Sequence, residues 1–423
     1  MEQFLSKDDI CAFLYFGYIP KLTENTYRPP WNIEQVTDNQ KTLASLTESQ
    51  LIDEGVVILQ DSFNNISNGD HIVPLSGGLD SRAILGGLIE TGLRDQITTV
   101  TFGTPGTFDY DIGVHIAKKM NVRFETIDLT KIIVNENQLM ETAEDLGECF
   151  WIFDAFYNRQ IPKKFGSGAI YWSGFLGDPL AGSHLPKIEH ASWKEVKKHF
   201  MEHGKFVKSI DLTPPEYRMD SRIPNVPLLS NSPLCYEELL DFSVRQDFYI
   251  KKIILISNFN YQAPFLNDGW VNFILNIPKR YRKNEYLYKK ILMRAYPELF
   301  RLPVKDNFGL PLNAPYLKNI VHKAINNTQS FCSKCLPGVF TGESPMINYI
   351  DFNKALRSKK DLKNIVYNNV QDLAKRHLID WVDIINIWGL HQKGKGNYAD
   401  ALTLLTSLEI YLKYLEKSAI HQN

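Results

Sequence analysis

The chain has 423 residues, more than a single hydrophobic core usually holds, so its length predicts two to three domains or one large two-lobed unit. Its 47 basic and 48 acidic residues give a formal net charge of −1, which excludes an overall attraction to nucleic acid or to anionic lipid. Any anion site must therefore be local, and no apolar run approaches the roughly 18 residues of a membrane span.

The first ten residues, MEQFLSKDDI, are acidic rather than basic and contain no apolar run that leads to a cleavage site. We therefore expect a cytoplasmic protein without a secretory signal. The five cysteines agree, because a disulfide framework normally uses an even number. Cys332 and Cys335 form one CxxC pair. We interpret them as plain thiols, with half of a zinc site or a redox pair as the alternatives.

Short runs of β-branched and aromatic residues in the first half of the chain predict four strands. These runs are residues 71–75, 96–102, 123–129 and 169–173. Segments with helical spacing lie between them, and the longest runs from about residue 141 to 164. Strands that alternate with helices predict an α/β fold with a parallel sheet sandwiched by helices. Ligands bind such sheets at the carboxyl ends of the strands.

After about residue 186 the pattern becomes mostly helical. The clearest helices are expected at residues 237–257, 284–296, 370–389 and 399–416. We therefore predict three parts, divided near residue 190. Residues 1–65 form a short amino-terminal linker with helical segments, residues 66–190 an α/β core and residues 191–423 a helical lobe.

A glycine-rich turn follows the first predicted strand. Residues Ser76 to Ser81 read SGGLDS and precede a segment with helical spacing. Gly77 and Gly78 let the backbone approach an anion closely, since no Cβ blocks it and a positive φ costs little. Backbone N–H groups at the helix start would face that anion, with the two serine hydroxyls as further donors. The turn predicts a phosphate-binding loop; the alternative is a plain helix N-cap in a serine-rich turn.

The acidic residue of the turn indicates which phosphates it holds. A Walker loop supplies a lysine to the terminal phosphates, whereas this turn carries Asp80 and no lysine. A carboxylate beside a polyphosphate requires a bridging cation, most naturally Mg²⁺ bound through oxygen. The pattern favours binding of ATP with pyrophosphate as the leaving group.

The turn and several further blocks resemble the asparagine synthetase family, specifically its synthetase domain. The blocks are AFLYFGYIPKLT from residue 12, SGGLDS, TFGTPGTFDYDIGVHIAKKMNV from residue 101, SGFLGDPLAGS from residue 173, APFLND from residue 263 and LPVKDNFGLPL from residue 302. Their order along the chain is more specific than any one block. The resemblance implies the adenine nucleotide α-hydrolase-like fold with a PP-loop, and it extends to β-lactam synthetases and lasso-peptide macrolactam synthetases.

The resemblance also implies residue roles. The implied nucleotide-binding residues are Leu75, Ser76, Gly77, Gly78, Leu79, Asp80, Ser81, Phe102, Gly103 and Gly174. Among these, Phe102 and Gly103 would contact adenine. Asp80 and Asp178 would hold Mg²⁺ and take part in catalysis. Lys305 would contact phosphate and oppose the charge that develops in the transition state, which is a role suited to a fixed ammonium.

Other polar residues near these blocks carry weaker signals. Asp109 follows a turn that contains glycine and proline, and we interpret it as a structural N-cap. Arg82 directly follows the loop, where it could contact phosphate or be an exposed helix residue. His115 and His184 receive no role, because lone histidines are more often surface or packing residues.

The chain also departs from the family pattern. Residue 2 is Glu2 rather than a catalytic cysteine, and residues 1–65 are too few for a glutaminase domain. The nitrogen would then come from solution, from a partner protein or from an amine on the substrate. Phe175 stands where asparagine synthetases carry a glutamate, and it can neither accept a proton nor pair with ammonium. Gln262 stands where many members have arginine, so both positions argue against aspartate as the substrate.

The expected function is therefore that of an AMP-forming carbon–nitrogen ligase. It would adenylate the carboxylate of a small molecule or peptide with ATP and Mg²⁺ and transfer the acyl group to an amine or ammonia. The alternative from another class is a catalytically reduced nucleotide-binding scaffold of a biosynthetic complex. A tRNA-modifying adenylase is weaker, since the sequence has no basic excess, and we expect no nucleic-acid or membrane partner.

Overall fold

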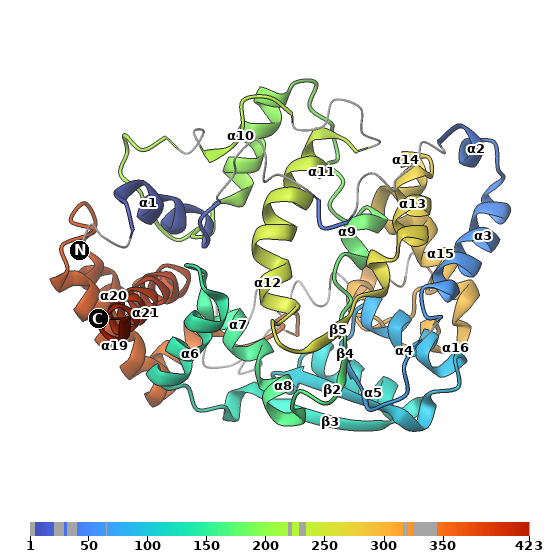
Figure 1. Cartoon of the computed structure of the whole chain (residues 1–423), viewed down its shortest axis with the longest axis horizontal. Helices are drawn as coiled ribbons and strands as arrows, with labels where there is room; N and C mark the ends of the chain where they lie inside the picture. Colours follow the sequence, from blue (N-terminus) through green and yellow to red (C-terminus); the bar gives the residue numbers. More distant parts are fainter. Residues whose placement is uncertain are drawn as a thin grey trace.

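The computed structural model describes residues 5–20, 29–31, 40–64, 66–218, 222–227, 234–315, 318, 320–322, 324 and 345–422 (Figure 1). The Cys332 and Cys335 pair lies outside these residues. Its interpretation as plain thiols therefore stays a prediction. Among the described helices, none is both long enough and apolar enough to cross a bilayer.

Five parallel strands form one sheet in the order β3-β2-β1-β4-β5. The strands are β1 (His71–Pro74), β2 (Ile97–Gly103), β3 (Arg123–Asp128), β4 (Ile170–Trp172) and β5 (Asn260–Gln262). His71 lies opposite Ile97 on one side and Ile170 on the other. The chain thus adds β2 and β3 on one side of β1 and then places β4 and β5 on the other. The reversal between β1 and β4 is the point where open sheets of this kind bind ligands.

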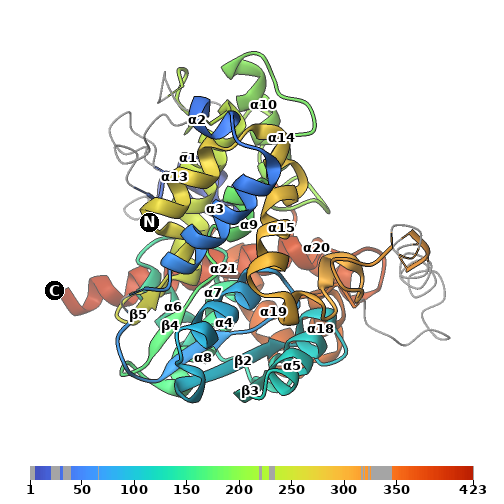
Figure 2. The same cartoon turned by 90° about the vertical axis from the view of Figure 1, so that its right-hand side faces the viewer.

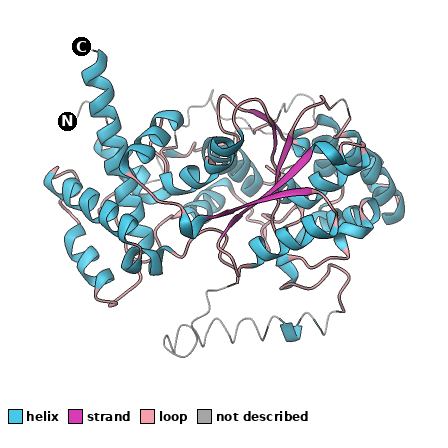
Figure 3. Ribbon diagram, turned by 90° about the horizontal axis from the view of Figure 1, so that it is seen from below, coloured by secondary structure: helices cyan, strands magenta, loops and turns pink. Residues whose placement is uncertain are grey.

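Helices cover both faces of the sheet, as Figure 3 shows. Alternate strand residues enter different cores: Ile72 and Tyr171 belong to one cluster, Val73 and Trp172 to the other. The first cluster contains α6 (Glu136–Leu146), α7 (Ile152–Asn158) and α8 (Gln160–Phe165), and behind them α21 (Ala399–Gln422), which packs on α6 and α7, and α19 (Lys360–Lys375), which packs on α21. The second cluster contains α3 (Glu48–Asp61), α4 (Asp80–Glu90), α5 (Phe108–Lys119), α13 (Asp268–Asn276) and α15 (Tyr286–Ala295). The predicted parallel sheet between two helical layers is confirmed.

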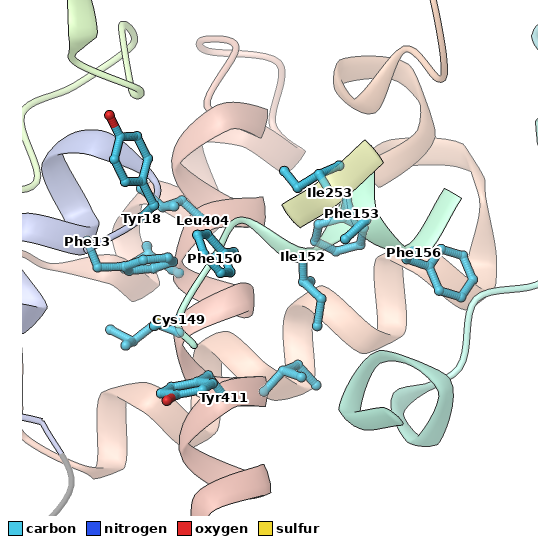
Figure 4. Close-up of a cluster of buried hydrophobic side chains, with 14 of the residues drawn as sticks. Phe13, Tyr18, Cys149, Phe150, Ile152, Phe153, Phe156, Ile253, Leu404 and Tyr411 are labelled. Atoms are coloured by element: carbon cyan, nitrogen blue, oxygen red, sulfur yellow. The ribbon is translucent and has the colours of Figure 1, made fainter. Parts of the chain in front are cut away.

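The core on the first face joins the two ends of the described chain. Figure 4 shows Phe13 of α1 (Lys7–Phe16) and Leu404 of α21 on one side of this core and Phe153 of α7 farther along it, with Phe150 between. All three side chains are fully buried. A fully buried aromatic or leucine side chain contributes about 1.5–3 kcal/mol relative to an exposed one. Because α21 packs on both α1 and α7, this core holds the amino-terminal and carboxy-terminal helices against the α/β core.

Local signals explain several helix boundaries. Ser6 and Asp9 form reciprocal capping bonds at the start of α1, and Gly17 ends it with φ at 79°. Thr47 and Gln50 form the same capping box at the start of α3. The remaining helices are α2 (Gln40–Ala44), α9 (Gly177–Ala181), α10 (Trp193–Gly204), α11 (Tyr236–Leu240), α12 (Lys251–Ile254), α14 (Lys279–Arg282), α16 (Pro297–Phe300), α18 (Phe352–Ser358) and α20 (Ile384–Gln392).

Three predicted helices were longer than the observed ones. The 141–164 segment is divided among α6, α7 and α8, because Gly147 ends α6 with φ at 66°. The 370–389 segment spans the end of α19 and the start of α20, with His377 at φ 56° between them. The 237–257 segment is helical, but its middle, Asp241–Ile250, is a π-helix. Apolar periodicity continued across each break and gave no sign of it.

Strand β5 was missed by the sequence analysis. Its residues Asn260 and Gln262 are exposed, so it lacks the apolar run of a buried strand. It pairs with β4 over three positions. Figures 1 and 2 show the surrounding segment as part of the mostly helical second half. The 191–423 segment thus contributes one strand to the sheet.

Candidate functional site

A cleft opens at the carboxyl ends of β1 and β4, where the strand order reverses. Two adjoining cavities of about 480 and 550 Å³ share several wall residues, among them Ser76, Asp80, Phe102 and Asp178. We call the two together the switch-point cleft. The loop after β1 and the loop after β4 both reach it, because the carboxyl ends of parallel strands share one edge of the sheet. Its position is therefore set by topology.

The SGGLDS turn is closed by hydrogen bonds of its own serines. The Ser76 N–H donates to Ser81 Oγ at 3.2 Å, and the Gly78 N–H donates to Ser76 Oγ at 3.2 Å. Helix α4 begins at Asp80, and the residue before it, Leu79, makes no side-chain capping bond. The interpretation of the motif as a plain N-cap is therefore wrong. The first N–H groups of α4 remain available to an anion in the cleft.

The glycines of the site serve close approach rather than unusual dihedral angles. A Cβ on Gly77 would lie 2.9 Å from the Phe108 carbonyl oxygen, and neither Gly77 nor Gly78 has a positive φ. The expectation of a positive φ in this turn is not met. A Cβ on Gly174 would lie 2.8 Å from Asp80 Cβ, and one on Gly177 2.3 Å from Asp80 Cγ. Gly177, which the sequence analysis did not select, thus lets the loop after β4 press against Asp80.

Asp80 and Asp178 lie side by side in the cleft. Asp80 Oδ1 accepts from the Tyr288 hydroxyl at 2.7 Å, and Asp80 Oδ2 accepts from the Asp178 N–H at 3.1 Å. Asp178 Oδ2 accepts from Ser183 Oγ at 3.0 Å. Burial and then the Asp178 charge raise the pKa of Asp80 well above its usual range. A divalent cation between the two carboxylates would remove this penalty.

The Lys305 side chain pairs with Asp109 and is not a solvated surface charge. Its Nζ donates to Asp109 Oδ2 at 2.5 Å and to Asn348 Oδ1, and its N–H donates to the Gly77 carbonyl at 2.9 Å. Asp109 also accepts from the Gly77 N–H at 3.2 Å. Thr107 occupies the cap position of α5, so the interpretation of Asp109 as an N-cap is wrong. Asp109 instead ties the lysine to the loop.

The described wall of the cleft is rich in carboxylates. It contains Asp80, Asp109, Asp178, Glu285, Asp306 and one ammonium group, that of Lys305. Burial raises the pKa of both Glu285 and Asp306. No three described His, Cys, Asp or Glu side chains are grouped closely enough to hold a metal ion by themselves. This donor set fits Mg²⁺, which commonly binds one or two carboxylates and completes its shell with phosphate oxygens and water.

Arg82 supports the loop from behind. Its side chain is fully buried, which contradicts an exposed helix residue. The guanidinium donates to the carbonyls of Pro303 at 2.7 Å, Leu299 at 3.1 Å and Gly77 at 3.4 Å. Its two Nη groups therefore face backbone carbonyls, and the phosphate contact that we considered for it is not supported. Arg82 fastens the segment before Lys305 to the SGGLDS turn.

Residues 348–349, which belong to the 191–423 segment, cover the end of β2. The ring of Tyr349 lies 5.7 Å from that of Phe102, and both rings line the cleft. A Cβ on Gly103 would lie 2.9 Å from the Asn348 carbonyl oxygen. Gly103 and Gly77 are not among the described residues that line the cleft, whereas Leu75, Leu79, Ser81 and Gly174 are. Asn348 and Tyr349 were not predicted from the sequence, because no local pattern marks them.

Phe175 and Gln262, the two positions that depart from the family pattern, line different cavities. Phe175 is buried and lines the cleft beside Ser173, whose Oγ accepts from its N–H at 3.2 Å. The Gln262 side chain lines another cavity, which shares Trp172 with the cleft, and its bearing on the substrate stays a prediction. His115 is exposed on α5. His184 lines the cleft, with Nδ1 2.7 Å from Asp241 Oδ2.

Comparison with known proteins adds no assignment, since neither a family model nor a curated protein matches the chain.

Proposed function

We propose that the chain is an ATP-dependent synthetase that activates a carboxylate as an acyl-adenylate and transfers it to a nitrogen nucleophile. One observation carries the proposal. The uncapped start of α4, the paired carboxylates of Asp80 and Asp178, and the ammonium of Lys305 all line one cleft at the switch point of a parallel sheet. These groups belong to the blocks that resemble the asparagine synthetase family, and that resemblance supports a PP-loop enzyme.

The phosphate end of the cleft would work by positioning and charge. The N–H groups at the start of α4 and the Ser76 and Ser81 hydroxyls would hold the outer phosphates of ATP. Asp80 and Asp178 would hold Mg²⁺, which when bound offsets the charge of the pyrophosphate leaving group. Lys305, held by Asp109, would oppose the charge that develops at the α-phosphate.

The chemistry then needs two displacements. A carboxylate oxygen of the substrate attacks the α-phosphorus, and pyrophosphate leaves with its electron pair. A nitrogen lone pair next attacks the acyl carbon, AMP leaves, and the nitrogen loses a proton. The part of the cleft beside Ser173 and Phe175 adjoins the phosphate end, so it is the place for the acyl group. Its buried phenylalanine favours an acyl group other than the short charged side chain of aspartate.

A catalytically reduced scaffold is the second candidate, and one observation favours it. The ammonium of Lys305 already has two acceptors, Asp109 and Asn348, in the described structure. Such a lysine could serve to close the site rather than to contact phosphate. The two candidates differ in whether phosphate chemistry follows nucleotide binding.

Carboxylate-dependent exchange of labelled pyrophosphate into ATP tests the proposal. A panel of carboxylic acids is screened with Mg²⁺ present and absent, with Asp80→Ala and Lys305→Ala as the site variants. Lys131→Ala is the matched control, because Lys131 is 82% exposed and lies on a turn after β3. We expect exchange in the wild type and the control and a loss of at least 10²-fold in Lys305→Ala. Binding of ATP without exchange for any acid would favour the scaffold.

A further inference from the structure

A second cavity, of about 530 Å³, adjoins the switch-point cleft. His184, Arg245 and Ile250 line both spaces, so the two meet at these side chains. We call the second space the side cavity. Its described aromatic lining consists of Phe16, Tyr18, Trp151, Phe200, Phe206 and Tyr249. Figure 4 shows the Tyr18 hydroxyl pointing away from the other labelled core side chains.

The size of the side cavity indicates what it can hold. One water molecule, or an ammonia molecule of similar size, takes up about 30 Å³. A space of about 530 Å³ lies within the range of small-molecule sites, which are mostly apolar and aromatic with a few polar groups. The side cavity is therefore too large and too apolar to be built for ammonia alone.

A carboxyl group lies in the aromatic wall. Asp154 of α7 lines the side cavity, and among the described residues its side chain has no hydrogen-bond partner. Burial raises the pKa of this carboxyl to about 7. A cationic ligand would pair with the ionised form and offset the cost of burial. The lining thus offers rings for an apolar body and a carboxylate for a positive group.

Asp154 also lies close to the cleft. Its charge contributes, after burial, to the raised pKa of Tyr349, whose side chain lines the cleft. His184 lines both the cleft and the side cavity where the two spaces meet. A ligand held by the carboxyl in the side cavity would therefore lie next to the space assigned to the acyl group.

We propose that the side cavity binds the nitrogen nucleophile as a primary amine on an aromatic or apolar body, and that His184 accepts the proton which this nitrogen loses. The inference rests on the proposed function, because it assigns the second substrate of that reaction. In the step, the bound ammonium first gives one proton to the Asp154 carboxylate, which frees the nitrogen lone pair. The N–C bond to the acyl group then forms, the C–O bond to AMP breaks, and AMP leaves with the electron pair. The second proton moves from nitrogen to His184.

The surroundings of His184 suit a base. Its Nδ1 lies 2.7 Å from Asp241 Oδ2, so the neutral ring donates from Nδ1 and leaves Nε2 as the acceptor. Burial lowers the pKa of His184, but the hydrogen bond and charge of Asp241 outweigh it and raise the pKa overall. Asp178 of α9 also raises it and Arg245 lowers it. These are the charged groups that act on the ring from the packed elements.

Further titratable side chains line the side cavity on the same side as His184. They are Glu237, His199, His203 and Lys205. Glu237 accepts from the ring of His190 at 2.9 Å, so that carboxylate is already paired. The aligned dyad of His184 and Asp241 is thus the group at the junction that is arranged to take a proton.

Direct binding tests the cavity independently of catalysis. Calorimetry compares phenethylamine with 2-phenylethanol, glucosamine and ammonium chloride, on the wild type, Asp154→Asn and the exposed control Asp95→Asn. We expect phenethylamine to bind at least tenfold more tightly than 2-phenylethanol. Asp154→Asn should remove this preference, whereas Asp95→Asn should keep it. Equal affinity for the amine and the alcohol, an unchanged preference in Asp154→Asn, or binding of glucosamine alone overturns the assignment.

Product formation tests His184. With ATP and the carboxylic acid that gives the strongest pyrophosphate exchange, phenethylamide formation is followed from pH 5.5 to 9. His184→Asn should slow it on the order of 10²-fold and remove the fall in rate at acidic pH, while exchange persists. His115→Asn is the matched control. An unchanged rate and pH profile in His184→Asn overturns the role of His184.

The binding experiment and the exchange experiment together show whether the proposed function or the amine site is wrong. If exchange is absent for every acid but phenethylamine binds through Asp154, the proposed function fails and the amine site stands. If exchange occurs but only ammonia is accepted and phenethylamine does not bind, the amine site fails and the synthetase stands.

Discussion

The phosphate end of the switch-point cleft and the side cavity are built in opposite ways. The first is made by a six-residue turn and two nearby loops, with backbone N–H groups and carboxylates as its working parts. The second is made by aromatic rings from segments as distant as Phe16 and Tyr249. Charge handling depends on a few atoms held rigidly, whereas recognition of an apolar body depends on the shape of a large wall. Substitutions of the residues that position the phosphate-binding groups should therefore affect stability and activity differently from substitutions of the residues that line the side cavity.

The largest effect is expected at the ion pair that holds the loop after β4. Arg282 and Glu238 are each 2% exposed and lie 2.5 Å apart, and the guanidinium also donates to the Leu180 carbonyl of α9 at 2.8 Å. Arg282→Met leaves a buried carboxylate without its partner. We expect a loss of about 3–5 kcal/mol in the free energy of unfolding.

Denaturant unfolding measures this loss. The double variant Arg282→Met with Glu238→Leu is the control, because it removes both charges and should recover part of the stability. If the single variant unfolds at the wild-type midpoint, α9 is not held by this pair.

A smaller effect is expected at Gly177, whose backbone packs directly against the Asp80 carboxylate. A Cβ there would lie 2.3 Å from Asp80 Cγ, so Gly177→Ala must displace the carboxylate or the loop. The expected cost is about 1–3 kcal/mol of stability, with loss of pyrophosphate exchange. Gly389→Ala in α20 meets no atom within 4 Å and should gain about 0.5–1 kcal/mol.

Thermal unfolding and exchange, measured on both variants, check this prediction. Gly177→Ala with full exchange and wild-type stability would mean that Asp80 is not confined by the loop after β4.

The smallest effect concerns the dyad at the junction and depends on pH. The Asp241 pKa is raised by burial but lowered overall by His184, and the His184 pKa is raised overall by Asp241. A carboxyl group whose pKa is lowered by folding stabilises the folded state at pH values above its unfolded pKa of about 4. A histidine whose pKa is raised by folding stabilises the folded state at pH values below its unfolded pKa of about 6.5. The dyad therefore contributes fully between about pH 4 and 6.5.

His184→Asn should accordingly lose on the order of 1 kcal/mol in that window. The loss should shrink as the pH rises through the raised histidine pKa, and again as it falls through the lowered pKa of Asp241. Unfolding of the wild type and His184→Asn at pH 5, 6 and 8 measures it. A difference that is constant with pH would assign His184 to packing alone.

Local sequence signals predicted most of the strands and helices of the α/β half. Each of the four predicted strands overlaps an observed one, and the turn at Ser76–Ser81 lies at the carboxyl end of β1 as expected. Long-range pairing decided the rest. β5 is three mostly exposed residues, and only its alignment with β4 makes it a strand. Asp109 has the local context of a cap, yet the approach of Gly77 and Lys305 gives it another role.

By itself, the sequence determined the strand–turn–helix unit around SGGLDS and the alternation that produces a parallel sheet. Both follow from steric and hydrophobic preferences of neighbouring residues. Tertiary structure alone decided that Asn348, Tyr349 and His184 line one cleft and that a side cavity adjoins it. These residues come from segments far apart in the sequence, and their contacts arise only when the two cores bury their apolar faces together.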